Sequence, residues 1–359
     1  MLQPTSLNSD SGSESGSRQG ERLLYYRGVD YEEKRMVDLG WIESREPVSL
    51  EVTEKLIGEL KARFADRMVI ASMVGSNRDE WLKVSRRLSQ AGADMIECDF
   101  SYSEQDAVIA EDIKLLEKAA RYLRDGARNT PVAIKLPGLL KQRAEIIETL
   151  KDAGIDSLTV YYEPKGVPGI NLSNFIPFPN VGQKSALSIM GGSATKPYTL
   201  GMLSEWGRVD RSLPLSVLGG AYTWRDAVEF LLMGASLIQF HGAVLQRGVG
   251  LVDELKNGVN DYLEEKMISS VDKLVGKSLP FLTEPENIRS PVRVVAGIDD
   301  KLCTRCGICY RACSELGYQA IDLNAQRKPS VDKKKCVGDG LCVAACPIVG
   351  CMSLRRLSK

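Results

Sequence analysis

The stretch CTRCGICYRAC, residues 303–313, decides the fold of the C-terminal part of the chain. Its four cysteines follow the spacing C-x2-C-x2-C-x3-C, with which thiolates hold iron–sulfur clusters. A second run, CVGDGLCVAACP at residues 336–347, repeats the pattern but carries an aspartate where a cysteine is expected. Eight of the nine cysteines lie between Cys303 and Cys351. In a chain expected to be cytoplasmic, this concentration indicates metal binding rather than disulfides.

The order of the cysteines predicts which of them share a cluster. In two-cluster ferredoxins, the first three cysteines of such a run hold one cluster and the fourth reaches the other. The ligands expected for a first [4Fe–4S] cluster are Cys303, Cys306, Cys309 and Cys346. Those left for a second cluster are Cys313, Cys336 and Cys342. Zinc is the alternative, but the interleaved order, with Pro347 after the last cysteine, disfavours it.

Asp339 stands at the position of the missing cysteine, between Gly338 and Gly340. Carboxylate is a harder ligand than thiolate, so an iron bound to Asp339 should be held less tightly. Three outcomes compete: a [4Fe–4S] cluster with Asp339 as a ligand, a [3Fe–4S] cluster without that iron, or no second cluster. The three retained cysteines argue against the last. Cys351 falls outside both sets and is expected to be a small buried residue near a cluster, with ligation less favoured.

The middle of the chain, from Arg67 to about Gly248, alternates apolar runs with segments of helical spacing. The apolar runs are RMVIASMV, ADMIECDF, PVAIKL, DSLTVYY, PLSVLGG and SLIQFHGA. Each predicts a strand buried on both faces, because apolar and polar residues do not alternate. The segments DEWLKVSRRLSQAG, AEDIKLLEKAARYLRDG, KQRAEIIETLKDAG and TWRDAVEFLLMG predict helices that each close on glycine. This repeat predicts a parallel sheet covered by helices, either a closed (β/α)8 barrel or an open doubly wound sheet.

Two late glycine pairs are candidates for a phosphate site. Gly191-Gly192 in SIMGGSATKP and Gly219-Gly220 in SVLGGAYTW each follow an apolar run and precede a helix. Backbone N–H groups at such turns bind phosphate, and barrels commonly place this site in late loops. The same glycines are equally consistent with tight strand-to-helix turns. No G-x-G-x-x-G follows the first strand, which disfavours a dinucleotide-binding sheet.

Composition limits the partners. The 47 basic and 47 acidic side chains cancel, so no net field attracts nucleic acid or an anionic membrane. No stretch approaches the roughly 20 apolar residues that span a bilayer, and the start lacks the features of a signal peptide. We therefore expect a cytoplasmic protein with small-molecule or protein partners. Residues 1–22 are rich in Ser, Gly and acidic side chains, which predicts a flexible tail.

Together, VIAS early, AIKL in the middle, the late glycine pairs and GIDDKLCTRCGICYRACSELGYQAIDL through CPIVGC resemble the dihydropyrimidine dehydrogenase family. The similar portion of that family is a dihydroorotate dehydrogenase-like barrel joined to a two-cluster ferredoxin domain, and the resemblance runs from about Arg67 to the end. It implies an α/β (β/α)8 TIM-barrel-like domain over residues 23–290, complete or lacking part of its N-terminal side. It also implies a small α+β ferredoxin-type domain over residues 291–359.

The resemblance also implies an FMN site. It matches Lys135 in AIKL to the family lysine that contacts the flavin ring, and both glycine pairs to the FMN phosphate loops. His241-Gly242 occupy the remaining position on the phosphate side. Although His241 is the only histidine, we expect it to shape the loop rather than to catalyse.

Two departures from the family affect the substrate site. The family carries Asn-x-Ser-Cys-Pro and then a catalytic cysteine, whereas this chain has ECDFSYSEQD, with Asp99 in place of the asparagine. The family's later Asn-Thr is Tyr162-Glu163 here. A site built for one hydrogen-bonding pattern rejects another, so we expect a substrate other than a pyrimidine. The weak candidates for catalysis are Asp99, Tyr102, Tyr162 and Glu163, which could equally rim an empty pocket.

The N-terminal side is short for a complete barrel. Residues 23–66 offer RLLYYRGVD, an extended piece DLGWIES and the helix SLEVTEKLIGELKARF, so six βα units are expected rather than eight. An open barrel exposes strand edges. A partner chain or the N-terminal segment itself must then cover them.

Two functions fit these observations. The first is an FMN-dependent iron–sulfur oxidoreductase subunit, which by resemblance acts on CH–CH bonds of a small molecule. The second is a non-catalytic barrel that docks a tethered ferredoxin domain as the electron-transfer subunit of a larger complex. Both predict a redox protein partner or an electron-donating subunit, and a homo- or hetero-oligomer. Lys135 and the glycine pairs favour the first, and the altered catalytic loop favours the second; the first is our main hypothesis.

Overall fold

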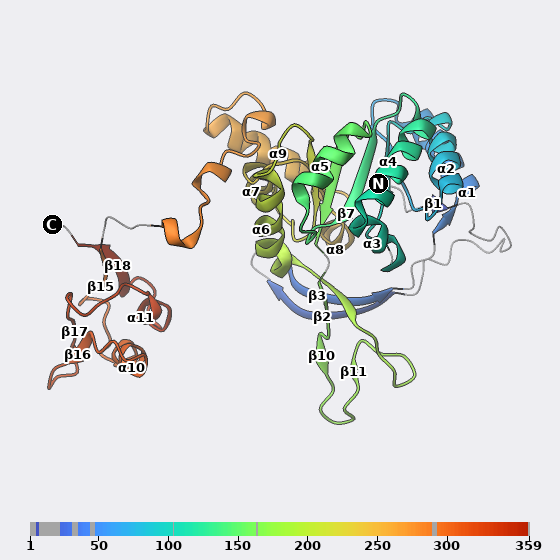
Figure 1. Ribbon diagram of the computed structural model, residues 1–359. Coiled ribbons are helices and arrows are strands. Elements are labelled where there is room, and N and C mark those ends of the chain that lie inside the picture. The colour runs from blue at the N-terminus through green and yellow to red at the C-terminus, as the bar shows by residue number, and fades with distance from the viewer. Residues whose placement is uncertain are drawn as a thin grey trace. The chain divides into compact units, whose positions relative to one another are not determined.

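The computed structural model describes residues 5–6, 22–30, 35–43, 47–102, 104–162, 164–288 and 293–357. The chain divides into two compact units, Met1–Leu282 and Thr283–Lys359 (Figure 1). The predicted boundary between residues 290 and 291 falls outside the described residues.

The N-terminal unit is built on an eight-stranded sheet of order β14-β13-β8-β7-β6-β5-β1-β4. Its longer strands are β5 (Ile70–Met73), β6 (Met95–Asp99), β7 (Val132–Pro137), β8 (Ser157–Tyr161), β13 (Leu215–Leu218) and β14 (Ala235–Gln239). These six strands pair in parallel, and each comes from one predicted apolar run. Among the described residues no pairing joins β14 to β4. The predicted barrel-like fold is confirmed as a partial, open barrel.

Helices cover this sheet, as the periodicity predicts (Figure 1). They are α1 (Leu50–Arg63), α2 (Arg78–Gln90), α3 (Glu104–Glu111), α4 (Ile113–Ala127), α5 (Arg143–Asp152), α6 (Lys196–Gly207) and α7 (Trp224–Leu232). Glycines with positive φ follow three of them as predicted, at Gly92, Gly154 and Gly234.

The prediction that Gly126 ends its helix is wrong. Helix α4 continues to Ala127, and its C-cap is Arg128, at a φ of 55°. Gly126 is buried against α2, where an added Cβ would lie 2.0 Å from Ser85 Oγ and 2.5 Å from the carbonyl oxygen of Leu82. This glycine lets two helices approach closely rather than ending one of them.

The core lies between the sheet and its helices. Its largest fully buried side chains include Trp206 of α6, Phe230 of α7 and Phe100 after β6. Trp206 donates its indole N–H to the carbonyl oxygen of Gly138 at 2.9 Å, so its one polar group is satisfied inside the core.

Two short strands extend the sheet beyond β5. Strand β1 (Thr5–Ser6) pairs in parallel with β4 (Val48–Ser49), and Thr5 also pairs with Met73 of β5. Within residues 1–22, predicted to be a flexible tail, Thr5–Ser6 lie in this sheet and Arg22 begins β2 (Arg22–Asp30), while residues 1–4 and 7–21 lie outside the described residues. The N-terminal segment itself extends the edge that the six predicted strands leave open.

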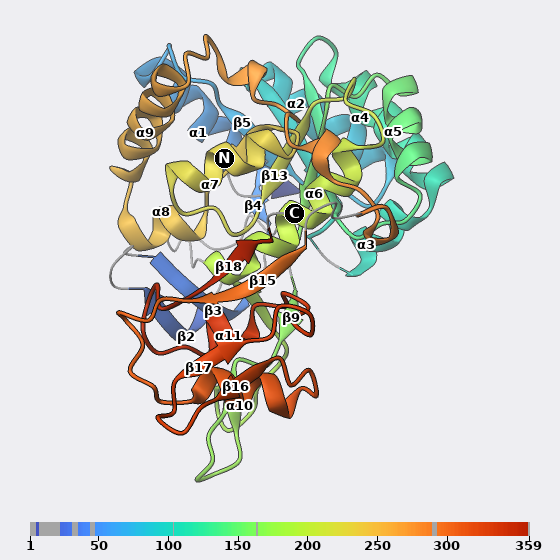
Figure 2. The ribbon, with the colours of Figure 1, turned by 90° about the vertical axis from the view of Figure 1, so that its left-hand side faces the viewer.

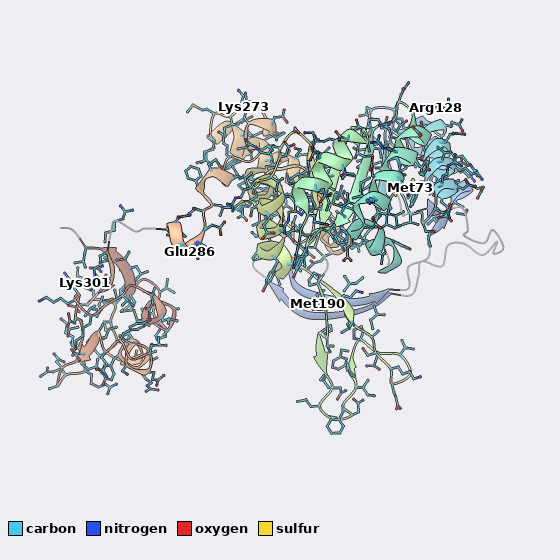
Figure 3. All side chains as sticks on the ribbon, viewed as in Figure 1. Met73, Arg128, Met190, Lys273, Glu286 and Lys301 are labelled. Atoms are coloured by element: carbon cyan, nitrogen blue, oxygen red, sulfur yellow. The ribbon has the colours of Figure 1, made fainter. Side chains whose placement is uncertain are left out.

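A separate antiparallel sheet has the order β2-β3-β12-β9. Its long hairpin, β2 (Arg22–Asp30) and β3 (Arg35–Glu43), curves below the parallel sheet in the view of Figure 1. Strand β12 (Ser188–Gly191), which contains Met190 (Figure 3), pairs with β3 and with β9 (Lys165–Gly166). In the pairing with β3, Met190 lies opposite Gly40. The run before Gly191-Gly192 is thus a strand, but it does not belong to the parallel sheet.

Between β9 and β12 an arm with strands β10 (Gly169–Ile170) and β11 (Pro177–Phe178) projects from the unit (Figure 1). Helices α8 (Gly242–Arg247) and α9 (Leu251–Glu265) follow β14, and α9 packs on α7 (Figure 2). The 3₁₀ turns are η1 (Ser193–Thr195), η2 (Val271–Lys273), η3 (Leu279–Phe281) and η4 (Pro285–Asn287).

The C-terminal unit is a small α+β fold, as predicted. Strand β15 (Val294–Ile298) pairs with β18 (Met352–Arg356), and β16 (Ile321–Leu323) pairs with β17 (Pro329–Val331), both antiparallel. Its helices are α10 (Ile308–Glu315) and α11 (Leu341–Ala344). Three of its cysteines are buried in the core of the unit: Cys309, Cys336 and Cys342.

Replacing Gly126 with Ala should destabilise the N-terminal unit by about 1–3 kcal/mol, because the new methyl group overpacks the α2–α4 contact. Gly58→Ala is the matched control, since Gly58 is an exposed position of α1 with nothing within 4 Å of the added Cβ. That change should stabilise the helix by up to about 1 kcal/mol. Urea unfolding measures both, and a stabilising Gly126→Ala would contradict this packing.

Candidate functional site

A cavity of about 680 Å³, counting its open mouth, lies at the carboxyl ends of β8, β13 and β14 and beside β12. Six of the seven residues predicted to bind a cofactor line it: Gly191, Gly192, Gly219, Gly220, His241 and Gly242. Barrels bind ligands at this edge of the sheet. The two late glycine pairs line the same cavity, although Gly192 and Gly219 are 27 residues apart in the sequence.

The cavity wall is built from turns that require glycine. Gly192, Gly219 and Gly220 have φ values of 98°, 127° and 79°, which side chains other than glycine rarely adopt. A Cβ on Gly220 would lie 2.4 Å from the backbone nitrogen of Lys196, at the start of α6. A Cβ on Gly242 would lie 2.8 Å from the hydroxyl oxygen of Tyr222. The glycines therefore present backbone to the cavity, which is the surface that a phosphate group needs.

The charges at this corner balance one another. Lys196 Nζ lies 2.7 Å from Asp226 Oδ1 and 2.9 Å from Glu229 Oε2. Burial alone would lower the pKa of Lys196, but the two carboxylates raise it. Asp226 also accepts the backbone N–H groups of Tyr222 and Thr223, at 2.9 and 2.8 Å, and so caps α7. An anion at the glycine turns would therefore depend on backbone N–H groups.

Lys135 and Asp99 form a buried ion pair. The two residues are neighbours in the β6–β7 ladder, and Lys135 Nζ lies 2.8 Å from Asp99 Oδ2. Ser101 donates to Asp99 Oδ1 from its backbone N–H at 2.8 Å and its hydroxyl at 2.6 Å. Burial alone would raise the pKa of Asp99, but Lys135 and Ser101 together hold it below its ordinary value. Asp99 therefore stays ionised, which makes it a poor general base.

Lys135 lies behind the cavity wall. Its Nζ is 4.6 Å from the ring centroid of Tyr161, which lines the cavity. The side chain of Lys135 is 10% exposed, and that of Asp99 is 5% exposed. The predicted flavin-contacting lysine is therefore one aromatic ring away from the cavity, with its charge paired.

Sequence analysis missed a polar network centred on Glu97. This buried residue accepts hydrogen bonds at Oε2 from Thr159 Oγ1, at 2.6 Å, and from Gln239 Nε2, at 2.9 Å. Burial raises the pKa of Glu97, while Lys135 opposes that shift. The missed signal is a charged residue inside an apolar run, two positions before Asp99 and so on the same face of β6.

The candidates for catalysis do not converge on one point. Tyr162 lines the cavity, and its ring stacks on Tyr198 with centroids 5.9 Å apart. Asp99 is buried in its ion pair, and Tyr102 follows it in a half-buried turn. Glu163 lies outside the described residues.

In the C-terminal unit the first cysteine set surrounds one cavity of about 320 Å³. Its lining includes Cys303, Cys306, Cys309, Cys346 and also Cys351. Burial raises the pKa of Cys309, with the other three predicted ligands nearby contributing. Among the described residues no three His, Cys, Asp or Glu side chains are gathered around a single-ion site. The first four residues have the types and order that a [4Fe–4S] cluster requires.

The second set also comes together. Burial raises the pKa of Cys342 to about 11, and the negative charge of nearby Asp339 adds to the effect, together with Cys336 and Cys313. The backbone N–H of Ala296 donates to Cys336 Sγ, and that of Ala320 to Cys313 Sγ, each at 3.3 Å. Such N–H donors to sulfur tune cluster potentials. The residues present fit two clusters.

Asp339 has the backbone setting of a ligand. In the first run, Cys306 lies between Arg305 and Gly307, at φ values of 61° and 77°. In the second, Asp339 lies between Gly338 and Gly340, at 76° and 79°. The exposed Asp339 accepts the backbone N–H of Leu341 at Oδ1, at 3.2 Å. The two loops therefore have the same shape, and the aspartate replaces the thiol without rebuilding the turn.

A partial βα barrel with a glycine-lined cavity, joined to a unit with two interleaved cysteine sets, defines an iron–sulfur oxidoreductase with a flavin-type barrel. Residues 48–263 match dihydroorotate dehydrogenase, and residues 296–354 match a 4Fe-4S dicluster domain. The chain therefore belongs to the dihydroorotate dehydrogenase family and carries a 4Fe–4S dicluster domain. The resemblance to dihydropyrimidine dehydrogenases is confirmed.

The chain is 32% identical over 280 residues to the NAD-dependent dihydropyrimidine dehydrogenase subunit PreA of Escherichia coli K12, covering 76% of this chain and 68% of that one. It is 28% identical over 262 residues to the chloroplastic dihydropyrimidine dehydrogenase (NADP(+)) of Arabidopsis thaliana, covering 68% and 61%. Ligand-free dihydroorotate dehydrogenase from Eimeria tenella superposes with a TM-score of 0.56 at 13% identity, covering 77% and 80%. That last similarity supports the fold alone.

Replacing Asp99 with Asn should destabilise the chain by about 3–5 kcal/mol, because Lys135 is left buried without its counter-charge. Asp79→Asn is the control: Asp79 pairs with Lys83 at 3.1 Å on an exposed face of α2, and this change should cost less than about 1 kcal/mol. Urea unfolding at pH 7 compares the two variants. If both variants lower the free energy of unfolding by equally small amounts, the buried ion pair does not stabilise the sheet.

Proposed function

We propose that the protein is an oxidoreductase subunit in which two iron–sulfur clusters of the C-terminal unit exchange electrons with FMN in the barrel cavity. The observation that carries this proposal is the convergence of six predicted cofactor residues on one glycine-lined cavity. The second unit of the same chain gathers two sets of cluster ligands. Such a chain can join a one-electron relay to a two-electron site.

The chain's own residues would hold FMN by its phosphate. Backbone at Gly191-Gly192 and Gly219-Gly220 would receive the phosphate, with His241-Gly242 closing the same side. FMN, when bound, supplies hydride and electron transfer. Tyr161 and Tyr162 would bound the cavity, while the Lys135–Asp99 pair fixes the charge behind Tyr161.

We infer that the substrate is not a pyrimidine. Among the residues lining the cavity, Gln239 is the only one with a carboxamide side chain, and its Nε2 already donates to Glu97 at 2.9 Å and to Ser216 at 3.2 Å. Tyr162 supplies an aromatic ring where the family presents an amide. A cavity lined by Tyr161 and Tyr162, whose one carboxamide is already engaged, favours a less polar small molecule.

The second cluster would be bound by Cys313, Cys336 and Cys342 with Asp339 as the fourth ligand. The matched backbone of the two runs supports a [4Fe–4S] cluster with one aspartate ligand, which loses that iron readily to become [3Fe–4S]. The first cluster would be an ordinary [4Fe–4S] cluster on Cys303, Cys306, Cys309 and Cys346.

One observation favours the alternative, a non-catalytic barrel that docks a tethered ferredoxin. Asp99 is the candidate acid–base carboxylate at the family's substrate loop. Both of its oxygens already accept hydrogen bonds, from Lys135 and from Ser101. Flavin content separates the two functions, because only the enzyme needs FMN.

We further propose a redox protein partner that supplies or accepts electrons, in a homo- or hetero-oligomer; the E. coli relative is named as a subunit. No helix in the described part of the chain has the length and apolar character needed to cross a membrane. A cytoplasmic location stays a prediction.

Flavin, iron and sulfide counted in anaerobically purified protein test the proposal, with about one flavin and about eight irons expected per chain. Gly220→Ala should weaken flavin binding by about tenfold or more, because it strains a turn with positive φ by about 1–3 kcal/mol. Gly201→Ala, in α6 with nothing within 4 Å of the new Cβ, should retain the flavin. Absence of flavin from the wild-type protein would contradict the enzyme function and favour the non-catalytic barrel with a tethered ferredoxin domain.

Asp339→Cys should make the second cluster keep its fourth iron in air, because thiolate holds iron more tightly than carboxylate. The mirror change, Cys306→Asp, should make the first cluster labile in the same way, since the two turns share one backbone conformation. Iron per chain and electron paramagnetic resonance after air exposure report both. Unchanged cluster content and potential in Asp339→Cys would show that Asp339 is not a ligand.

A further inference from the structure

The first cluster site has one thiol more than a [4Fe–4S] cluster needs. Cys351 lines the same cavity as Cys303, Cys306, Cys309 and Cys346 and is 3% exposed. Its thiol shares this cavity with those of Cys346 and Cys303, the two ligands nearest to it. A buried thiol beside two cluster ligands is more than a small core residue, because thiolate is the ligand that iron in these clusters prefers.

Cys351 is held in place by backbone on both sides. Its carbonyl oxygen accepts the N–H of Asp299 at 2.7 Å, and its own N–H donates to Ile348 at 3.2 Å. Gly350, at a φ of 80°, turns the chain immediately before it, and Met352 begins the ladder with β15. The thiol is therefore fixed at the cavity by the same strand pair that closes the unit.

The bond that Cys351 makes now is weak. Its Sγ lies 3.8 Å from the carbonyl oxygen of Asp299, a long contact even for sulfur. Cys346 Sγ is similarly placed, 3.6 Å from the carbonyl oxygen of Ile348. Replacing the Cys346 sulfur by the Cys351 sulfur at an iron would therefore break only weak hydrogen bonds. Neither cysteine belongs to a long helix, so the backbone can shift slightly to allow the exchange.

We propose that Cys351 is a reserve ligand of the first cluster, which takes over an iron when the thiolate of Cys346 or Cys303 is lost. This proposal rests on the cluster part of the proposed function and not on the flavin. In the exchange, the bond from iron to the Cys346 sulfur breaks and a bond from the same iron to Cys351 Sγ forms. The proton of the Cys351 thiol passes to the departing thiolate, so no electron is gained or lost.

The second site is built differently. The groups that act on Cys342 are the exposed carboxylate of Asp339, Cys336 and Cys313, together with Cys309 of the first set. Among the described cysteines, Cys351 is the one outside both predicted sets that lines a cluster cavity, since Cys98 is buried in the core of the N-terminal unit. The chain thus gives the first site a spare thiol and the second a weaker ligand, so the first cluster should outlast the second under oxidative loss.

Substitution of Cys346 tests the proposal most simply. Cys346→Ala should retain the first cluster with its four irons, and Cys346→Ala/Cys351→Ala should lose it. Cys306→Ala is the matched control: the proposal lets Cys351 replace Cys346 or Cys303 only, so this variant should lose the first cluster. Iron and sulfide per chain, with the electron paramagnetic resonance signal of the reduced protein, report the outcome in full-length protein.

The proposal is wrong if Cys346→Ala loses the first cluster to the same extent as the double variant. The proposed function would still stand in that case, provided that the wild-type protein holds both clusters. If the Cys346 variants do not fold, Cys351→Ala in the otherwise unchanged chain decides the matter. Under limited oxidation its first cluster should decay several-fold faster than in the wild type. Equal decay rates would contradict a reserve role.

Discussion

The buried ion pair of Lys135 and Asp99 sets the polarity at the centre of the barrel sheet. Each charge is sustained by the other at 2.8 Å, and removing either would leave an uncompensated charge in a low-dielectric interior. The same two charges act on Glu97 in opposite directions, and burial then keeps its pKa high. Lys135 Nζ lies 4.6 Å from the ring centroid of Tyr161, which lines the cavity, whereas Lys135 is not among the lining residues.

The two cluster sites show how one backbone supports different ligands. Left-handed residues flank both Cys306 and Asp339, so the same kind of turn carries a thiol in the first run and a carboxylate in the second. The softness of the donor atom then decides how tightly the iron is bound, because thiolate binds this iron more tightly than the harder carboxylate does. Cys351 lines the cavity of the first set, whereas the second set has the exposed carboxylate of Asp339 nearby, so the two sets differ in the donor atoms they offer.

Local signals in the sequence predicted much of this architecture. The apolar runs predicted six parallel strands, and the cysteine spacing predicted a first set of residues that the structure places around one cavity, because each signal lies within about a dozen residues. Long-range pairing could not be predicted in this way. Thr5–Ser6 join the sheet only through Val48–Ser49 and Met73, and β12 leaves the parallel sheet because β3 and β9 hold it. Gly126 marks a helix contact rather than a helix end, and Asp99, treated as a lost asparagine, turned out to pair with Lys135.

The central claim is that one chain holds a flavin in its barrel and two clusters in its C-terminal unit. An anaerobic reductive titration of the purified protein, followed by absorbance, tests it most directly. The account predicts an uptake of about four electrons per chain, two for the flavin and one for each cluster, with flavin absorbance bleaching during the titration. An uptake of about two electrons or fewer, with no flavin absorbance to bleach, would contradict it.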